Sequence, residues 1–482
     1  MADAKRNQKP LEKTNGTSIQ DATEVSRGLR RCLLKVRFLA TILAMSEEKK
    51  QKLSTDSYKG VRDFYPADMA IQNYIFGVIK KVVESYGYLE YSASILESAD
   101  LYKAKTGEEI VNEQTYTFTD RGGREVTLRP EMTPTVARMV AKNQKALLFP
   151  LRWYSIPNLF RYEQPQRGRL REHWQLNADI FGEKSLHAEV EIISLASSIM
   201  RAFGVKDNQF EIRINSRKII NYIFGELFAF PEETRSELAK LIDKKEKMGA
   251  AVFKAALKTA AGEKTDKLLT LLNSKNFEEF AKSLGETAGE KAGMDEIKTV
   301  IASLEKLGIT NVVFDQTLMR GFDYYTGVVF EIFDQNPDNR RSLFGGGRYD
   351  DLLEIFGKEK VPAVGFGMGD VTIRDVLETY SLLPSPTSKI KLALCTIDEN
   401  GIGYAEEVAQ ELRAQDISVI VNYSDKKVGD QIKSVVRQSI PYVICIGSDE
   451  IKSGKLKLKE LASGKETELE SSNVAMHIKN QK

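Results

Sequence analysis

The sequence predicts an α+β protein in which an antiparallel sheet domain carries a helical insertion and precedes a small α/β domain. Residues 161–182 alternate polar and apolar side chains in two stretches joined by an arginine-rich loop, as two paired strands do. Residues 218–306 are rich in Ala, Lys, Glu and Leu, are nearly free of Pro and have a helical pattern. Residues 390–446 alternate strand and helix patterns, which indicates parallel strands joined by helical crossovers.

Length and composition are those of a globular protein of two or three domains. The chain has 482 residues, of which 42% are hydrophobic and 29% charged, and its formal net charge is +2. The excess of Lys and Arg lies in residues 1–44, so overall charge does not indicate a nucleic-acid partner, and an RNA-binding surface must be a local patch. No apolar run approaches the roughly 18 residues that span a bilayer, so we expect no membrane partner.

The cysteines and histidines argue against a metal site. Cys32, Cys395 and Cys445 are far apart and form no C-x-x-C pair, which excludes the usual zinc spacing and a disulfide framework. The chain has only three histidines, so we expect no histidine-based metal cluster. Three unpaired cysteines fit a reducing compartment, and we therefore expect a cytoplasmic protein.

Residues 1–50 are interpreted as a disordered N-terminal extension. Residues 27–43 are basic and apolar, which faintly resembles a targeting segment, but the acidic residues upstream and the lack of a small-residue cleavage pattern argue against that interpretation. Met45-Ser-Glu-Glu-Lys-Lys50 is typical of the start of a cytoplasmic protein. We therefore expect residues 1–44 to be dispensable.

The sheet domain begins with an amphipathic helix. Apolar residues recur at helical spacing over residues 67–86, and Gly87 ends the helix. A strand pair follows at 115–120 and 125–129, turned by Arg121-Gly-Gly-Arg124.

A strand-to-helix corner comes next in the chain. Thr133 and Pro134 fit the N-cap and first position of a helix, which places Glu131 in the corner. Carboxylates at such corners are often pocket residues, although a plain surface turn fits this segment equally well.

The strongest pattern is the pair of strands in residues 161–182. One face of the second strand carries hydrogen-bonding groups and the other is apolar, with His173, Gln175, Asn177 and Asp179 opposite Trp174, Leu176, Ala178 and Ile180. On the first strand Arg161 and Glu163 fall together, and the loop adds Arg167, Arg169 and Arg171. A polar sheet face beside several arginines suits a small zwitterion bound next to a polyphosphate. A solvent-facing hairpin with a basic turn is the alternative.

Strand character resumes after the helical insertion, at 311–314 and 328–333, with glycine-rich turns predicted at Gly345-Gly-Gly347 and Gly365-Phe-Gly-Met-Gly369. Residues 381–388 have the composition of a linker. Strands are then predicted at 390–396, 417–422 and 442–446, helices at 403–415 and 428–439, and a closing hairpin at 455–461 and 466–469. We therefore place the sheet domain at 51–384, with its insertion at about 218–306, and the α/β domain at 389–478.

A second informative tract is Met319-Arg-Gly-Phe-Asp-Tyr-Tyr-Thr-Gly-Val-Val-Phe-Glu331, which on its own is compatible with simple aromatic packing. It also matches, nearly residue for residue, a motif peculiar to histidyl-tRNA synthetases. Residues 161–182 resemble the second signature motif of class II aminoacyl-tRNA synthetases, in the version of that family. Ser342-Leu-Phe-Gly-Gly-Gly-Arg-Tyr-Asp350 and Lys59-Gly-Val-Arg-Asp-Phe-Tyr-Pro66 resemble two further elements of the family, and the similarity covers about residues 52–478 in order.

This resemblance implies a class II catalytic domain with an antiparallel sheet and a helical insertion, followed by an anticodon-binding α/β domain. It implies a homodimer, because the helix at 67–86 lies where the family has its dimer-forming first motif. The implied substrates are L-histidine, ATP with Mg²⁺, and tRNA(His). The amino acid's carboxylate attacks the α-phosphate of ATP, pyrophosphate leaves, and the terminal ribose of the tRNA takes the histidyl group. Such chemistry depends on positioning and charge neutralisation.

The resemblance also assigns roles to single residues. The two arginines that flank the α-phosphate, and also contact histidine, match Arg161 and Arg320. The remaining ATP contacts match Glu163, Arg169 and His173, the last in place of a stacking Phe. The groups at the α-amino end of histidine match Glu131, Thr133 and Gln175, and those around its imidazole match Asp179, Tyr324 and Tyr325. A carboxylate and phenols can offer both an acceptor and a donor to the ring, and such a pocket rejects apolar analogues.

The third motif departs from the family pattern Gly-x-x-x-Gly-x-Glu-Arg. In Gly365–Arg374 the position of the arginine is occupied by Thr372. Arg374 lies two residues on, about 200° around a helix, so it cannot take this role without a shift in register. Either another arginine holds ATP or ATP is held more loosely. No βαβ unit frames the glycines, so they are not a dinucleotide fingerprint.

Two rival interpretations remain. One is a catalytically silent paralogue, the regulatory subunit of the first enzyme of histidine biosynthesis, which shares the catalytic fold. The other is a non-enzymatic RNA-binding or scaffold protein. The departure in the third motif favours the first rival, whereas the intact tract at 320–331 and the carboxy-terminal domain argue against it.

Overall fold

The computed structural model describes residues 53–103, 114–245, 248–285, 292–319, 324–339, 341–385 and 388–481. Residues up to Tyr58 form a unit of their own, and the part of it that is described, 53–58, contains no helix or strand. The predicted extension at 1–50 and the predicted catalytic residue Arg320 lie outside the described residues. Both therefore stay predictions.

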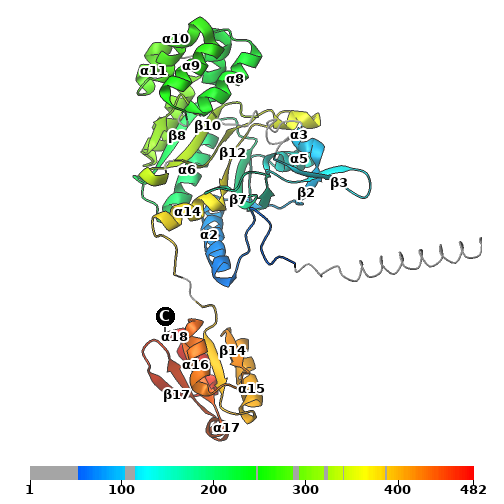
Figure 1. Ribbon diagram of the computed structural model, residues 1–482, viewed down its shortest axis with the longest axis vertical. Helices are drawn as coiled ribbons and strands as arrows, with labels where there is room; N and C mark the ends of the chain where they lie inside the picture. The colour runs from blue at the N-terminus through cyan, green and yellow to red at the C-terminus, as the bar shows by residue number, and fades with distance from the viewer. Residues whose placement is uncertain are drawn as a thin grey trace, which may run out of the picture. The chain divides into compact units, whose positions relative to one another are not determined.

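A nine-stranded, largely antiparallel sheet forms the first domain (Figure 1). The strand order is β1-β5-β7-β12-β11-β10-β8-β9, and β6 pairs with β7. The pairs β1–β5 and β8–β9 are parallel, and the other pairs are antiparallel. The strands are β1 (Leu89–Glu90), β5 (Leu151–Ser155), β6 (Asn158–Phe160), β7 (Glu172–Phe181), β8 (Phe210–Ser216), β9 (Val312–Phe314), β10 (Val328–Asp334), β11 (Ser342–Arg348) and β12 (Ala363–Gly369). The predicted α+β class is confirmed.

Helices cover one face of this sheet and leave the other for a site. The apolar face of β7, with Leu176, Ala178 and Ile180, shares one core with side chains of the covering helices. These helices are α2 (Pro66–Ser85), α6 (His187–Ala202) and α14 (Asp370–Thr379) (Figure 1). Burying each large aliphatic side chain contributes about 1.5–3 kcal/mol. Because a strand alternates its side chains, the polar groups of β7 then face away from these helices.

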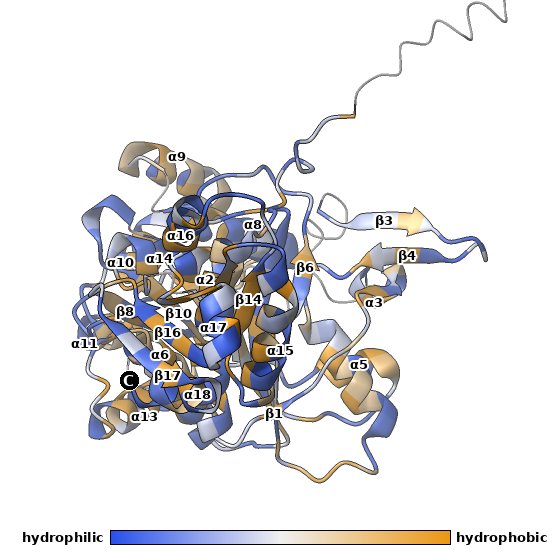
Figure 2. Ribbon diagram, turned by 90° about the horizontal axis from the view of Figure 1, so that it is seen from below, coloured by the Kyte–Doolittle hydropathy of each residue, from blue (hydrophilic) through white to orange (hydrophobic). Residues whose placement is uncertain are grey.

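A second, three-stranded sheet lies near the corner that contains Glu131. Its order is β2-β4-β3, with β2 (Leu96–Ser98), β3 (Tyr116–Thr119) and β4 (Glu125–Leu128). The β3–β4 hairpin projects from the domain and is mostly polar, as Figure 2 shows. The predicted strand pair is thus confirmed. The neighbouring helices are α3 (Ala99–Lys103) and α5 (Thr133–Asn143).

Three local predictions are wrong. Thr133 is the first residue of α5 rather than its N-cap, because Met132 before it takes the cap position with near-helical backbone angles and no side-chain cap. The first strand of the pair in 161–182 ends at Phe160, so Arg161 and Glu163 lie in the loop. The two glycine-rich tracts are not turns but parts of β11 and β12, where they pair with each other and with β7. Their glycines allow close approach of neighbouring backbone and side chains, as Gly365 illustrates in the site.

The insertion is helical, as predicted. Its elements are α7 (Arg217–Tyr222), the π-helix η1 (Ile223–Leu227), α8 (Glu232–Asp243), α9 (Ala250–Ala261), the 3-10 turn η3 (Gly262–Lys264), α10 (Thr265–Leu272), α11 (Phe277–Leu284) and α13 (Met294–Lys306). Their buried apolar residues join the core beneath the main sheet. Two further 3-10 turns follow in the sheet domain, η4 (Pro337–Asn339) and η5 (Leu352–Phe356).

The carboxy-terminal α/β domain has a five-stranded sheet of order β14-β13-β15-β16-β17. The parallel strands are β13 (Leu392–Thr396), β14 (Val419–Asn422) and β15 (Tyr442–Ile446), and the closing hairpin is β16 (Lys455–Glu460) and β17 (Glu466–Glu470). The helices are α15 (Asn400–Ala414), α16 (Val428–Arg437), α17 (Ser448–Ser453) and α18 (Ser471–Asn480). The predicted parallel core is confirmed, whereas α17 and α18 were not predicted. In the described ranges no helix is both long and apolar enough to cross a membrane.

Candidate active site

A small hollow of about 100 Å³ opens on the polar face of the main sheet. Strands β7, β11 and β12, the corner before α5 and the segment that leads into β10 all contribute to its walls. It brings together seven of the predicted site residues: Glu131, Thr133, Arg161, Gln175, Asp179, Tyr324 and Tyr325. The remaining lining residues are Asn177, Gly345, Tyr349, Gly365, Phe366 and Gly367.

Asp179 provides a buried acceptor at the hollow. Its side chain is on β7 and the residue is only 3% exposed. Tyr349 donates a hydrogen bond to its Oδ1 at 2.5 Å, whereas Oδ2 has no partner among the described residues. Burial raises the pKa of Asp179 to about 7, against the hydrogen bond from Tyr349, which lowers it. An unpartnered buried acceptor costs about 1–3 kcal/mol, so a ligand N–H placed here would be stabilised.

Glycine on the neighbouring strand gives this carboxylate its space. Gly365 of β12 pairs directly with Asp179 across the sheet. A Cβ at Gly365 would lie 2.0 Å from Oδ1 of Asp179 and 2.8 Å from the carbonyl oxygen of Ala178, which is backbone and cannot give way. Close approach, rather than a turn, therefore requires glycine at this position.

Phenols line the hollow beside the two carboxylates. Tyr324 donates a hydrogen bond to Oε2 of Glu131 at 3.2 Å, which ties the corner before α5 to the segment before β10. The ring of Tyr324 lies 4.9 Å from that of Tyr325 and 5.8 Å from that of Tyr349, centroid to centroid. Glu131 is 2% exposed, so its carboxyl group is a buried acceptor suited to a ligand ammonium group. The predicted surface-turn alternative for Glu131 is therefore wrong.

Tyr349 contributes a functional side chain to this hollow that the sequence analysis did not assign. It belongs to the glycine-rich element 342–350, and that element was the available signal. Arg348 before it forms a buried, two-bond ion pair with Glu189 of α6, at 2.5 and 2.6 Å, which fixes the end of β11. Burial, and then the charge of Asp179, raises the pKa of Tyr349 well above its ordinary value, so the phenol stays a donor.

Comparison with known proteins identifies the family. A sequence model described as histidyl-tRNA synthetase matches residues 60–371, and one described as anticodon binding domain matches residues 391–481. A histidine–tRNA ligase of Leptospira biflexa is 44% identical over 437 residues, which cover 89% of this chain and 99% of that protein. The chain belongs to the histidyl-tRNA synthetase family.

Solved structures of family members have the same fold. The histidyl-tRNA synthetase of Nostoc superimposes with a TM-score of 0.74 at 25% identity, over 89% of this chain and 100% of that one. A protein from Bacillus halodurans, described as an ATP phosphoribosyltransferase regulatory subunit/histidyl-tRNA synthetase, superimposes with a TM-score of 0.68 at 24% identity, over 82% of this chain and 99% of that one. The second likeness shows the fold alone.

Arg161, which the family resemblance places beside the α-phosphate, lines the hollow. Its Nε donates a hydrogen bond to the carbonyl oxygen of Pro130 at 2.8 Å, which orients the guanidinium. Glu163 and Arg169 lie further along the loop, with 3.8 Å between Oε2 and an Arg169 guanidinium nitrogen, and do not line the hollow. The Arg169 side chain is 61% exposed and available to a ligand.

His173 shares the polar face of β7 with Gln175 and Asp179 but does not line the hollow. It pairs across strands with Leu159 of β6. Burial, followed by the positive charges of Arg161 and Arg62, lowers the pKa of His173 to about 3, so its ring is neutral at physiological pH.

The two third-motif residues that differ from the family pattern, Thr372 and Arg374, bind groups outside the hollow. Thr372 donates hydrogen bonds to the carbonyl oxygens of Leu343 and Gly369, at 3.0 and 3.1 Å. Arg374 pairs with Asp68 and Glu378, at 3.1 and 2.9 Å. Neither side chain lines the hollow.

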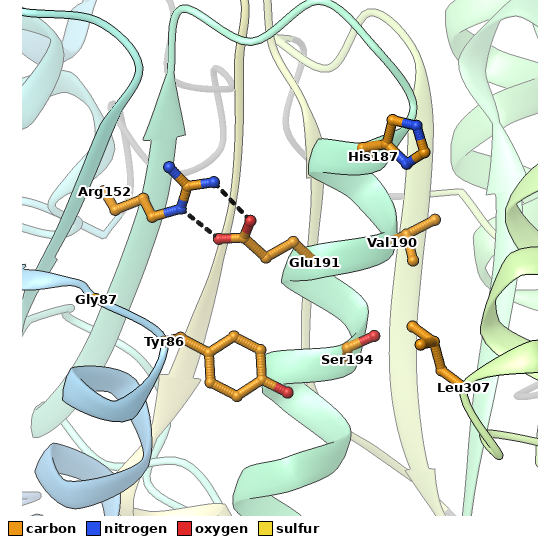
Figure 3. Close-up of a pocket in the computed structure, with 8 residues that line it drawn as sticks. All are labelled: Tyr86, Gly87, Arg152, His187, Val190, Glu191, Ser194 and Leu307. Atoms are coloured by element: carbon orange, nitrogen blue, oxygen red, sulfur yellow. Dashed lines mark hydrogen bonds and ion pairs between the residues drawn. The ribbon is translucent and has the colours of Figure 1, made fainter.

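A second, more open hollow of about 710 Å³ lies between the end of α2, strand β5 and helix α6 (Figure 3). Its two charged groups, Arg152 and Glu191, bind each other through two hydrogen bonds of 2.7 Å. Tyr88 also donates to Glu191, at 3.2 Å. Because this charge pair is already satisfied and none of the predicted site residues lines this hollow, it is not the candidate site.

Within the described ranges, no group of three His, Cys, Asp or Glu side chains could hold a metal ion. A family that uses ATP can still use Mg²⁺, since this ion is commonly held by substrate phosphates with one or two carboxylates.

Proposed function

We propose that this chain is a histidine–tRNA ligase that activates L-histidine with ATP and transfers it to tRNA(His). The observation that carries the proposal is the unpartnered Oδ2 of Asp179, buried beside the phenols of Tyr324, Tyr325 and Tyr349. An imidazole has one N–H donor and one ring-nitrogen acceptor, so it needs an acceptor and a donor at fixed separation. Asp179 supplies the acceptor for the imidazole N–H, and a tyrosine phenol supplies the donor to the other ring nitrogen.

The amino-acid end of histidine would lie toward the corner before α5. Glu131 would attract the ammonium group, and Thr133 and Gln175 would accept its remaining N–H bonds. This orientation directs the substrate carboxylate toward Arg161, which lines the same hollow. The α-phosphate of ATP would lie between Arg161 and Arg320, whose guanidinium groups would stabilise the charge that builds up as the carboxylate attacks.

The rest of ATP would lie along the loop that follows Arg161. Glu163 would accept from the adenine amino group, Arg169 would bind the outer phosphates, and the neutral ring of His173 would stack on adenine. Mg²⁺ would accompany the phosphates and offset their charge.

We further propose that the protein is a cytoplasmic homodimer and that its carboxy-terminal domain binds the tRNA. The domain boundaries 1–50, 51–384 and 389–478 belong to the same proposal. Leu89 on the edge strand β1 is 68% exposed, as expected for a side chain that a second copy could cover.

Histidine-dependent exchange of labelled pyrophosphate into ATP tests the activation step. We expect exchange with histidine and none when another amino acid replaces it, and histidylation of tRNA(His) when the tRNA is added. Folded protein that shows no exchange at saturating histidine and ATP would contradict the proposal.

A regulatory subunit without catalytic activity is the second candidate. Thr372 at the arginine position of the third motif favours it. The anticodon-binding match at 391–481 favours the ligase, because a subunit that only senses histidine has no use for such a domain. Histidine binding without pyrophosphate exchange would support the regulatory subunit.

A further inference from the structure

The carboxy-terminal domain presents an exposed aromatic side chain at the carboxyl edge of its parallel strands. β13 and β14 are parallel and in register, so Thr396 and Asn422 end at the same edge. Ligands of open α/β sheets bind at this edge. Tyr423 follows β14 directly and is 61% exposed, and Lys426 and Lys427 after it are exposed as well.

A buried amide holds the loop that carries these side chains. Gln431 of α16 is only 2% exposed. Its Nε2 donates to the carbonyl oxygens of Thr396 at 2.9 Å and Lys426 at 2.8 Å, and lies 3.5 Å from that of Ser424. One side chain thus ties the end of β13 to both halves of the loop. Its Oε1 has no partner among the described residues. The hydrogen bonds that this buried side chain makes are therefore those donated by Nε2.

Further hydrogen bonds hold the start of the loop at the end of β14. Ser424 donates its N–H to Oδ1 of Asn422 at 3.0 Å, and Thr396 donates to the carbonyl oxygen of Asn422 at 3.3 Å. The phenol of Tyr423 donates a hydrogen bond to Glu406 of α15 at 3.2 Å. This bond involves the hydroxyl group and not the face of the ring. A ring held at its edge and open on its face is suited to stacking.

We propose that residues 423–427 form a stacking platform for an unpaired base of the anticodon loop, with Gln431 as the residue that positions it. This inference rests on the proposed function and assigns residues to its RNA-binding step. Aromatic side chains bind unpaired bases because every base has a π face, and nearby lysines bind the phosphates. The segment has the exposed ring, the cations and a rigid support.

The test uses the full-length protein and two RNAs, complete tRNA(His) and a hairpin of its acceptor stem alone. Replacing Tyr423 by Ala should raise the KM for complete tRNA by about 5- to 150-fold, the range for loss of one stacked base. Tyr423→Phe keeps the ring and loses only the hydrogen bond to Glu406, so it should raise this KM much less than Tyr423→Ala does. Histidylation of the acceptor hairpin and pyrophosphate exchange should be unchanged in both variants, because neither involves the anticodon loop.

Gln431→Leu tests the positioning role, with Gln438→Leu as its matched control. Gln438 lies at the end of the same helix, and its amide bonds only to the exposed Ser434, at 3.3 Å. We expect Gln431→Leu to raise the KM for complete tRNA but not for the acceptor hairpin, and Gln438→Leu to change neither. A loss of thermal stability without a change in this KM would overturn the positioning role.

An unchanged KM in Tyr423→Ala would overturn the platform itself. Failure of the wild-type protein to exchange pyrophosphate would instead contradict the proposed function, so the two failures are distinguishable.

Discussion

Replacing Asp179 by Asn should weaken histidine binding and at the same time stabilise the empty protein at alkaline pH. The variant keeps the shape of the side chain and removes its charge. Burial raises the pKa of Asp179 from 3.8 to about 7, so the folded protein holds a proton there that the unfolded chain has lost. Stability contributed by this group is therefore greatest below pH 3.8 and falls as the pH rises toward 7.

The magnitude follows from the shift. Each unit of pKa difference corresponds to about 1.4 kcal/mol, so the buried carboxyl costs about 2 kcal/mol at pH 5 and about 4 kcal/mol at pH 8. Asparagine removes this pH-dependent cost. It leaves an amide N–H to be satisfied, but that cost is the same at both pH values. The stability of Asp179→Asn relative to the wild type should therefore rise by about 2–3 kcal/mol between pH 5 and pH 8.

Binding should change in the opposite direction. At pH 8, where Asp179 is ionised, loss of a hydrogen bond to this charged acceptor costs about 1.5–3 kcal/mol, which is about 10- to 150-fold in the affinity for histidine. Calorimetric titration measures that affinity. Melting curves at the two pH values measure stability, and the relevant transition in the wild type is the one that histidine raises.

Asp100→Asn is the matched control, because its side chain is 86% exposed and the substitution should change neither quantity. Parallel stability curves for wild type and Asp179→Asn from pH 5 to pH 8 would refute the buried, protonated state of Asp179. Unchanged histidine affinity would refute its place in the imidazole site.

Three further predictions concern other parts of the site. Gly365→Ala places a methyl group against Asp179, so the KM for histidine in pyrophosphate exchange should rise at least tenfold, and a normal KM would exclude a tight site there. Glu189→Ala leaves Arg348 buried with only its longer ion pair to Asp350, at 3.3 Å, which should lower the unfolding free energy by about 2–4 kcal/mol in urea titrations, whereas a loss below 1 kcal/mol would show that Asp350 or water compensates the guanidinium. Arg320→Ala should reduce the exchange rate by about 10²–10³-fold with an unchanged circular dichroism spectrum, and near-normal turnover would remove this residue from the mechanism.

The sequence predicted the polar face of the site because that face obeys a simple period. Gln175 and Asp179 are four residues apart on one strand, so alternation alone places them together, and the structure confirms this. The approach of Glu131 to Tyr324 could not be predicted in this way. The two residues are 193 positions apart, and only the folded sheet brings the corner before α5 to the segment before β10.

The failed predictions have local physical causes. Glycine favours turns when only the chain's own backbone is considered, but Gly365 is required by a side chain on another strand, which no local pattern reveals. Helix α18 buries only Val474, Ala475 and Ile478, which is too short a repeat to stand out from the preceding hairpin.

Because Thr372 replaces the third-motif arginine, other arginines must bind the phosphates of ATP in the proposed site. Arg167 and Arg341 lie near the loop but are both committed to Asp375, the first at 2.8 Å. A guanidinium already paired with a carboxylate must lose that partner before it can bind phosphate, which weakens its contribution. Arg169 is different, because its contact with Glu163 is long and its side chain is mostly exposed. Of these three loop-side arginines, Arg169 therefore has the weakest existing ion pair, which supports the proposal that it binds the outer phosphates.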